Sequence, residues 1–436
     1  MLATLRQRNF VLLFLGGLIS QMGDWLLKIG LPVYIYTLTS SALATSITLI
    51  ISFLPTIVLG SLAGVFVDRW DRRRTMLVAN MLQGLGLLPL LLVSRQEDFW
   101  LLYLVLFFES CASQFVLPAE SALIPSLVPE ENLLAANALK SSSSYVARLL
   151  GAALGGILLG QLGLHTVVLL NAASFFFVCL MLWLIRLPAA PPQLHSSSTP
   201  VAIQVDGLSF SPSLMNVLSS GTSRLVNEWL EGLSLIRTRP ILLMLLSALC
   251  LTGLGEGIFG VLLIVFVQRV LHGDAVVYGA LLSIQMVGNL LGTICITPLH
   301  KHASHLLLCW TSFLLFGIID LLIIDIPIVY PGLWLVFVLF VLVGIPGTIG
   351  FVSMQTLFQT LVDDTLRGRI FGTMLSVNAM VSLVGMLIAG TLGDRLGPVI
   401  LLNFQGGTYI ASGLLLFFAF RFQSTRSPVT DVSGAK

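Results

Sequence analysis

Charged residues are scarce in this 436-residue sequence: Asp, Glu, Lys and Arg make up 10% of it, against about 25% in an ordinary soluble domain. The chain is 56% hydrophobic, with a mean hydropathy of +0.99. No soluble core could absorb that much apolar surface. A net charge of +2, with no basic face clear of the apolar runs, excludes a nucleic-acid-binding role.

Motifs for catalysis and metal binding are also missing. The chain contains no Walker loop, HExxH or GxSxG motif, so no enzyme is expected. The five cysteines lie in apolar runs without CxxC spacing and are expected to be small buried hydrophobes. His300, His302 and His305 flank Lys301 without a nearby carboxylate or cysteine, which favours a basic surface loop over a metal site. No cofactor is expected.

What the chain does have is apolar runs of about the 20 residues that cross a bilayer. Polar or Pro/Gly breaks separate twelve of them. The expected spans are 10–36, 43–67, 75–94, 99–122, 135–160, 164–187, 240–268, 275–299, 304–325, 331–356, 369–393 and 397–420. The sequence therefore predicts an all-α polytopic membrane protein with twelve transmembrane helices.

Lys and Arg are distributed unevenly between the loops. With both termini in the cytoplasm, 17 of the 22 fall on that side, three fall outside, and Lys28 and Arg148 lie within spans. Cytoplasmic loops of membrane proteins show this excess. We therefore expect a multi-pass protein of the cell membrane with both termini cytoplasmic.

The two halves of the chain resemble each other. An offset of 234 places Gly151, Gly156 and Gly163 on Gly385, Gly390 and Gly397, and an offset of 232 places Gly23-Asp24 on Gly255-Glu256. Such a repeat is typical of transporters. The expected parts are an N-terminal six-helix bundle (1–187), a cytoplasmic linker with a short amphipathic helix (188–239), a pseudo-symmetric C-terminal six-helix bundle (240–422) and a cytoplasmic tail (423–436).

Ionisable residues within spans are costly in lipid and are candidates for function. At 1.5 Å per residue, Asp24 and Glu256 both lie about 24 Å along equivalent spans. Lys28 follows Asp24 by one turn, either to neutralise it or to act with it on substrate or protons. Glu109 and Arg148 lie near the midplane and are expected to pair, for function or only to fix helix register. Glu256 has no basic partner on its own span and is the first choice for a proton-binding group; Asp320 has no assigned role.

A charged loop follows the second span. Gly64-Val65-Phe66-Val67-Asp68-Arg69-Trp70-Asp71-Arg72-Arg73 resembles the GxxxDRxxRR signature of the major facilitator superfamily. The resemblance implies a gating latch in a tight cytoplasmic turn, formed by Gly64, Asp68, Arg69, Arg72 and Arg73, with the arginines also free to meet anionic membrane lipids. The alternative is a positively charged cytoplasmic anchor alone.

Local segments are similar to the drug:proton antiporter subgroup, which includes macrolide efflux proteins and enterobactin-type exporters. They are Ser20-Gln21-Met22-Gly23-Asp24, Pro118-Ala119-Glu120, Ala135-Ala136-Asn137-Ala138-Leu139 and Arg367-Gly368-Arg369-Ile370-Phe371-Gly372. Gly151, Gly155 and Gly156 resemble the antiporter motif GPxxGG, with alanine replacing proline. This departure weakens the argument for antiport over other modes of export. A late Gly390-x-x-x-Asp394-Arg395 copy of the loop signature lies on the outer side and is interpreted as coincidental.

The resemblance implies a central cavity between the halves, faced by Asp24, Glu109 and Glu256. Its expected apolar walls include Trp25, Phe108 and Phe259. The hypothesis is a monomeric secondary transporter that exports an amphipathic small molecule, such as a drug, macrolide or siderophore-like compound, driven by a proton gradient. The alternatives are a lipid or lysolipid flippase of the same fold and a non-transporting membrane sensor.

Overall fold

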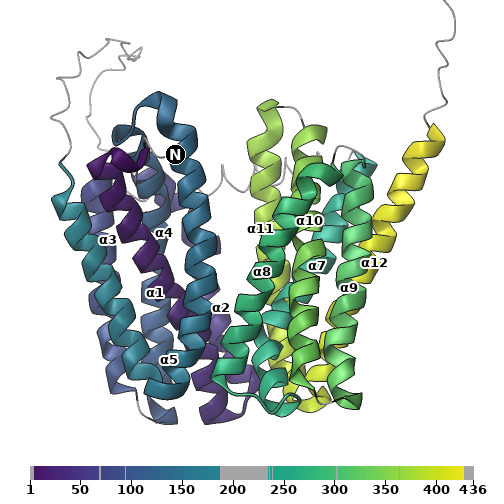
Figure 1. The fold of residues 1–436 in the computed structure, drawn as a ribbon, viewed down its shortest axis with the longest axis horizontal. Helices are drawn as coiled ribbons and strands as arrows, with labels where there is room; N and C mark the ends of the chain where they lie inside the picture. The colour runs from purple at the N-terminus through teal and green to yellow at the C-terminus, as the bar shows by residue number, and fades with distance from the viewer. Residues whose placement is uncertain are drawn as a thin grey trace, which may run out of the picture.

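The computed structural model describes residues 4–67, 70–93, 95–186, 234, 236–237, 239–300, 303–330, 332–362 and 364–426. Figure 1 shows two helical bundles side by side. The first bundle contains α1 (Arg8–Thr39), α2 (Ala42–Val67), α3 (Arg72–Leu87), α4 (Phe99–Leu123) and α5 (Leu133–Leu184). The second contains α7 (Pro240–Arg269), α8 (Ala275–Leu299), α9 (His305–Val329), α10 (Leu333–Leu361), α11 (Asp364–Leu396) and α12 (Pro398–Arg426). The expected linker helix falls almost wholly outside the described residues.

The longest helix, α5, contains two spans. Gly163 breaks it with φ +77° and ψ 177°, a backbone conformation that glycine adopts without strain. The repeat-equivalent Gly397, at φ +80°, separates α11 from α12. Eleven described helices are long and apolar enough to cross a membrane, and the break in α5 makes twelve crossings. The predicted all-α fold of two six-helix bundles is confirmed.

The helices exceed the predicted spans mainly at one end of the molecule. We call the end that carries the termini the inner end and the opposite one the outer end (Figure 1). At the inner end α10 continues to Leu361, α11 begins at Asp364 and α12 continues to Arg426. Hydropathy marks only the part of a helix that lies in hydrocarbon, whereas backbone hydrogen bonds continue into water.

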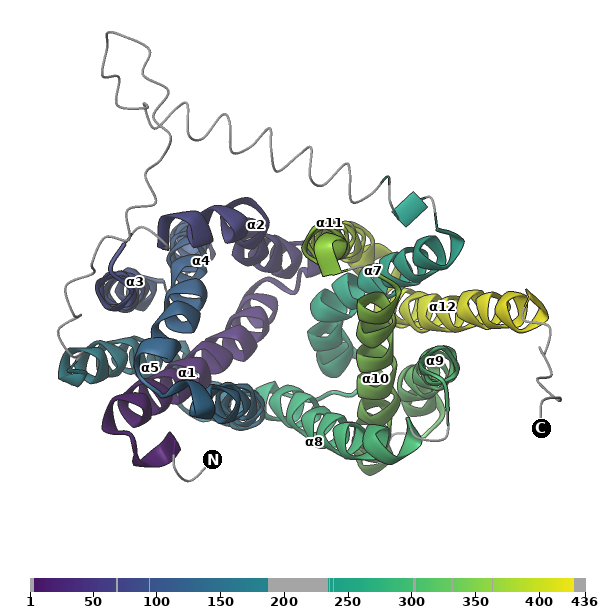
Figure 2. The same ribbon diagram turned by 90° about the horizontal axis from the view of Figure 1, so that it is seen from above.

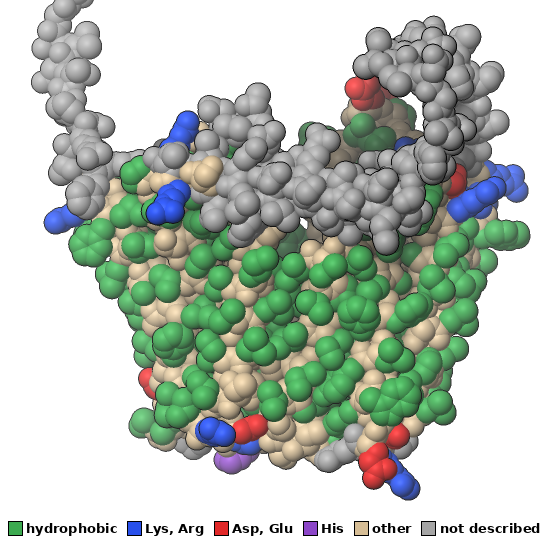
Figure 3. All heavy atoms as spheres, turned by 180° about the vertical axis from the view of Figure 1, so that it is seen from behind, with side chains coloured by type: hydrophobic (Ala, Val, Ile, Leu, Met, Phe, Trp, Pro, Cys, Tyr) green, Lys and Arg blue, Asp and Glu red, His purple; other side chains and the backbone are tan. Residues whose placement is uncertain are grey.

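The surface is divided into bands of different polarity. Figure 3 shows mostly apolar side chains between two ends where the charged side chains gather. Large apolar residues such as Leu104, Ile294 and Phe351 are exposed in the middle of their helices. An exposed apolar surface of this extent matches lipid rather than water.

The bundles meet along two pairs of helices, α5 with α8 and α2 with α11 (Figure 2). Ser283 of α8 donates a 3.1 Å hydrogen bond to the carbonyl of Leu149, and Ser46 of α2 donates a 2.6 Å hydrogen bond to the carbonyl of Met386. Figure 1 shows the bundles diverging from this junction toward the inner end. We call this arrangement, with the bundles in contact near the outer end and apart toward the inner end, inward-open.

Glycines make the junction close. A Cβ atom on Gly156 of α5 would clash with the carbonyl oxygen of Ala275 and lie 3.1 Å from the Cα atom of Gly279 on α8. The repeat-equivalent Gly390 of α11 faces α2 in the same way, 3.4 Å from the Cα atom of Leu43. Small residues allow such backbone approach between membrane helices. The sequence repeat therefore corresponds to a repeated contact between the halves.

We predict that Gly156→Ala lowers the Tm of the purified protein in detergent. The added methyl group overpacks the α5–α8 contact, at a typical cost of about 1–3 kcal/mol. Gly260→Ala is the matched control, because nothing lies within 4 Å of a Cβ atom there and alanine favours helix by about 1 kcal/mol. Equal Tm values for the two variants would contradict the role of Gly156.

Candidate functional site

Trp25 of α1 has two cationic side chains close to its ring. Lys28 Nζ is 5.3 Å and Arg148 Cζ is 4.7 Å from its ring centroid. Both distances are within the range of cation–π attraction. Gly151 and Gly155 position the ring by bringing α5 against α1: a Cβ atom on Gly151 would lie 2.5 Å from that of Trp25. The antiporter-like motif thus packs α1, while Gly156 beside it packs the other half.

Asp24, Lys28 and Glu109 form one charged group in the N-terminal half. Lys28 attracts both carboxylates, and Gln83 of α3 donates a 3.1 Å hydrogen bond to Glu109. The expected pairing of Glu109 with Arg148 is wrong in this conformation. The helical face on which Glu109 lies points it toward α1 and α3, which sequence spacing alone did not specify.

Arg148 has its acidic neighbour in the other half. The charges of Arg148 and Glu256 attract each other, and the Tyr409 hydroxyl of α12 lies within hydrogen-bonding range of Glu256. Glu256 is exposed, although apolar helices surround it. The acid therefore has no basic partner on its own span, as predicted, but the opposite bundle supplies one.

The two expected aromatic walls differ in position. Phe108 is 44% exposed and packs against Gly86 of α3, with 3.0 Å between its Cδ1 atom and a Cβ atom built on that glycine. Helix α3 lies at the periphery in Figure 2. The prediction that Phe108 lines the central cavity is therefore wrong, whereas Phe259 is half-buried on α7 beside the central core.

A polar cavity of about 310 Å³ extends through the N-terminal half from Asp24 and Lys28 toward the inner end. Its other polar lining residues are Ser20, Gln21, Asn80, Gln83, Ser113, Glu120, Lys140 and Ser144. Glu120 and Lys140 form a 2.9 Å ion pair across α4 and α5. Sequence reasoning missed this cavity, although Gln83 and Glu120 are conspicuous as polar residues in apolar spans.

The inner loop motif is only partly visible. Asp68 and Arg69 lie outside the described residues, and Gly64 is in the last turns of α2. Arg72 begins α3 and is exposed. Arg73 donates hydrogen bonds of 2.7 and 2.8 Å to the carbonyls of Leu182 and Trp183, so it ties α3 to the end of α5. The gating latch in this loop remains a prediction.

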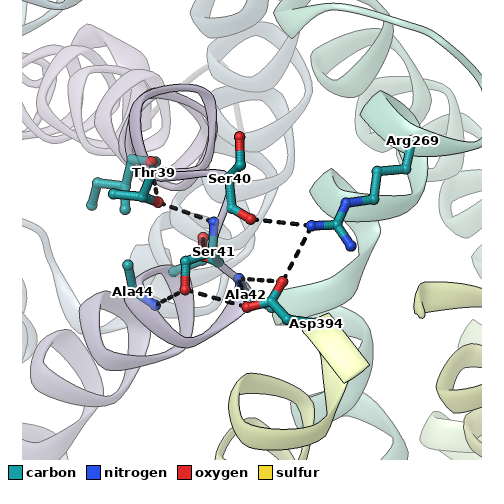
Figure 4. Close-up of polar contacts among 9 residues, drawn as sticks. Thr39, Ser40, Ser41, Ala42, Ala44, Arg269 and Asp394 are labelled. Atoms are coloured by element: carbon teal, nitrogen blue, oxygen red, sulfur yellow. Dashed lines mark hydrogen bonds and ion pairs between the residues drawn. The ribbon is translucent and has the colours of Figure 1, made fainter. Parts of the chain in front are cut away.

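A second latch closes the outer end (Figure 4). Asp394, in the last turns of α11, accepts a 3.0 Å hydrogen bond from the backbone nitrogen of Ala42 at the start of α2. Arg269 of α7 lies 3.3 Å from the Asp394 carboxylate and donates a 3.1 Å hydrogen bond to the carbonyl of Ser40. A carboxylate at a helix N-terminus is favourable because the free backbone N–H groups and the helix dipole attract it.

This outer latch corrects the interpretation of Gly390-x-x-x-Asp394-Arg395 as coincidental. Gly390 packs on α2 and Asp394 caps α2, so the motif joins the halves. The same spacing in the sequence separates Gly64 from Asp68 in the inner copy of the motif. Only the inner copy was interpreted as functional, because the family signature places the motif there.

The structure has two six-helix bundles that meet near the outer end, and ionisable side chains lie within their spans. This is the architecture of a secondary transporter. The chain belongs to the Major Facilitator Superfamily, whose family model matches residues 13–374 and 245–434. The expectation of a transporter rather than an enzyme is confirmed, as is the family resemblance of the inner loop.

Among relatives, the enterobactin exporter EntS of Citrobacter koseri is 26% identical over 434 residues, 98% of this chain and 95% of that one. Macrolide efflux protein A of Streptococcus pyogenes is 23% identical over 395 residues, 89% and 90% of the two chains. A crystal structure of a bacterial homologue of the iron transporter ferroportin, in its inward-facing state, superposes with a TM-score of 0.72. It is 15% identical and covers 94% of this chain and 98% of that one. That likeness shows the fold alone.

We predict that Asp394→Ala loosens the outer end. Loss of a helix cap costs about 1 kcal/mol, enough to shift a two-state equilibrium about fivefold. Spin labels at His165 and Val329, one at the outer end of each half, should report a larger population of long distances. Arg395→Gln, an adjacent charge change outside the outer latch, should retain the wild-type distribution. Identical distributions in Asp394→Ala and wild type would exclude a latching role.

Proposed function

We propose that the protein exports an amphipathic small molecule by proton-coupled alternating access. The single observation that supports this most is the attraction between the charges of Glu256 and Arg148, which lie on different halves, with Arg148 beside Trp25. A carboxyl group at that place links proton binding to the attraction between the bundles. The efflux activities named for the relatives support the direction of transport.

Protonation of Glu256 removes the negative charge that faces Arg148. An ionised pair in an apolar surrounding attracts strongly, whereas a neutral acid leaves the cation without a counter-charge. Proton binding therefore weakens one contact between the halves and favours their rearrangement. Proton release toward the open inner side restores the contact, which gives the proton gradient control over the conformational cycle.

The substrate site we propose lies between Trp25 and Phe259, with Asp24, Lys28, Arg148 and Glu256 as its polar groups. An aromatic ring beside two cations suits a molecule that combines an apolar body with a polar or charged part. The N-terminal cavity supplies a polar route from the inner end to this site. We further propose that the protein works as a monomer in the cell membrane, with both termini cytoplasmic.

The direct test is uptake into inverted membrane vesicles with and without an imposed pH gradient. The panel contains a macrolide, a siderophore and a lysolipid, so that drug export, siderophore export and lipid movement are separated. Accumulation of a water-soluble amphipathic compound that depends on the gradient supports the proposal. Gradient-independent movement of the lysolipid alone would replace it with a flippase function.

We predict that Glu256→Gln fails to concentrate the substrate but still allows downhill exchange. Glutamine retains the size and hydrogen-bonding capacity of the side chain, but its amide group does not bind or release a proton in the pH range of the assay. Glu131→Gln, an exposed acid outside the central site, serves as the matched control and should behave as wild type. Accumulation at the wild-type level in Glu256→Gln would refute the assignment, and the same result in Asp24→Asn with Glu256→Gln would remove both acids from coupling.

A further inference from the structure

Asp320 is a carboxyl group buried inside the C-terminal bundle. It lies in the middle of α9, is 2% exposed, and its Oδ2 atom has no hydrogen-bond partner among the described residues. The groups that act on it are Gln405 and Tyr409, both on α12. Helix α10, which also packs against α9, has no titratable side chain between Leu333 and Leu361. No described cation offsets a charge on Asp320.

Close helix packing holds the carboxyl group against α12. A Cβ atom on Gly317 of α9 would lie 2.7 Å from the carbonyl oxygen of Gly406, and one on Gly406 would lie 3.3 Å from Oδ2 of Asp320. Glycine at both positions therefore leaves the space that the acid occupies. The packing of α9 against α12 therefore fixes the position of the Asp320 carboxyl group.

The side chain of Gln405 lies within hydrogen-bonding range of Asp320. Gln405 is itself 2% exposed, and its Oε1 atom has no hydrogen-bond partner in the part of the chain that the structure describes. Two buried acceptors, one on each side chain, thus lack a donor. A neutral carboxylic acid carries an O–H donor, whereas a carboxylate carries none. One proton on Asp320 supplies the missing donor and removes an unpaired buried charge.

Tyr409 connects this pair to the central site. It is 7% exposed, its ring centroid is 4.2 Å from that of Phe316 on α9, and its hydroxyl group lies within hydrogen-bonding range of Glu256. Gly255, adjacent to Glu256 in α7, packs on Gln405, with 3.1 Å between its Cβ position and Cγ. The groups therefore run from the exposed Glu256 through Tyr409 and Gln405 to the buried Asp320.

We propose that Asp320 and Gln405 form a second proton-binding site in the C-terminal half, coupled to Glu256 through Tyr409. A proton from the central site binds the Asp320 carboxylate and forms a neutral acid, and the reverse step returns it. The negative charges of Asp320 and Glu256 both act on Tyr409, and Tyr409 is the group through which we expect the occupancy of one acid to affect the other. The inference deepens the proposed proton coupling and rests on it for its role in transport.

The decisive variant is Asp320→Asn, because asparagine imitates the neutral acid but cannot exchange a proton. If Asp320 is a proton-binding site, the purified full-length variant takes up about one proton fewer per chain than wild type across a pH jump. The readout is a pH-indicator dye in detergent without substrate. Asp325→Asn is the matched control: Asp325 lies on the same helix, is exposed, and accepts a 2.8 Å hydrogen bond from Asn403.

A transport assay measures the consequence for coupling. Each coupled proton multiplies the limiting accumulation about tenfold per pH unit of gradient, since about 1.4 kcal/mol corresponds to a factor of ten. We therefore expect Asp320→Asn to lower the limiting accumulation about tenfold per pH unit, with downhill exchange retained. Asp320→Leu, which keeps neither the hydrogen bonds nor the charge, separates folding effects from proton binding through its folded yield.

The outcomes distinguish the two proposals. Equal proton uptake by Asp320→Asn and wild type means that Asp320 does not change its protonation state across the pH jump, and this overturns the second site whatever the transport result. Gradient-independent transport by wild type overturns the proposed coupling, while reduced proton uptake in Asp320→Asn would still support the site. A further outcome is that Glu256→Gln loses accumulation while Asp320→Asn accumulates substrate as wild type does. This result leaves Glu256 as the coupling acid and rejects a role of Asp320 in coupling.

Discussion

A charge inside hydrocarbon is costly, about 2.5–3.5 kcal/mol on insertion scales for Asp, Lys or Arg at a helix centre, and this cost organises the whole molecule. Outer surfaces of the bundles are apolar (Figure 3), and the ionisable side chains of the spans turn inward. Asp24, Lys28 and Glu109 gather in one half, and the charges of Arg148 and Glu256 attract each other from different halves. A transporter can use these groups because each one lies where water or an opposite charge offsets its burial.

Glycines decide where the helices come close enough for that arrangement. Gly151 and Gly155 bring α5 onto α1 and position Trp25, while Gly156 and Gly390 bring the halves together. In the C-terminal half, Gly255 brings α7 onto α12. The charged site and the junction between the halves thus rest on the same packing. Movement of one bundle against the other changes both at once, which is how proton binding and conformation become linked.

The outer latch and the midplane site act on the same conformation. Asp394 and Arg269 hold the start of α2 at the outer end, and Arg148 faces Glu256 nearer the centre. Both contacts cross between the halves in the inward-open arrangement. A change that weakens either contact favours separation of the halves at the outer end. Proton binding at Glu256 and loss of the cap on α2 therefore shift the same conformational equilibrium.

The sequence by itself determined the twelve spans, their two-fold repeat and the identity of most ionisable groups, because hydropathy and glycine spacing are local and survive without knowledge of packing. It did not determine which side chains of different helices lie next to each other. Arg148 was matched with Glu109 instead of Glu256, Phe108 was placed in the cavity instead of against α3, and Asp394 was dismissed. Each of these depends on the direction in which a side chain leaves its helix and on which helix lies beside it. Only the tertiary structure decides such contacts, because residues far apart in sequence, such as Asp320 and Gln405, meet through helix packing alone.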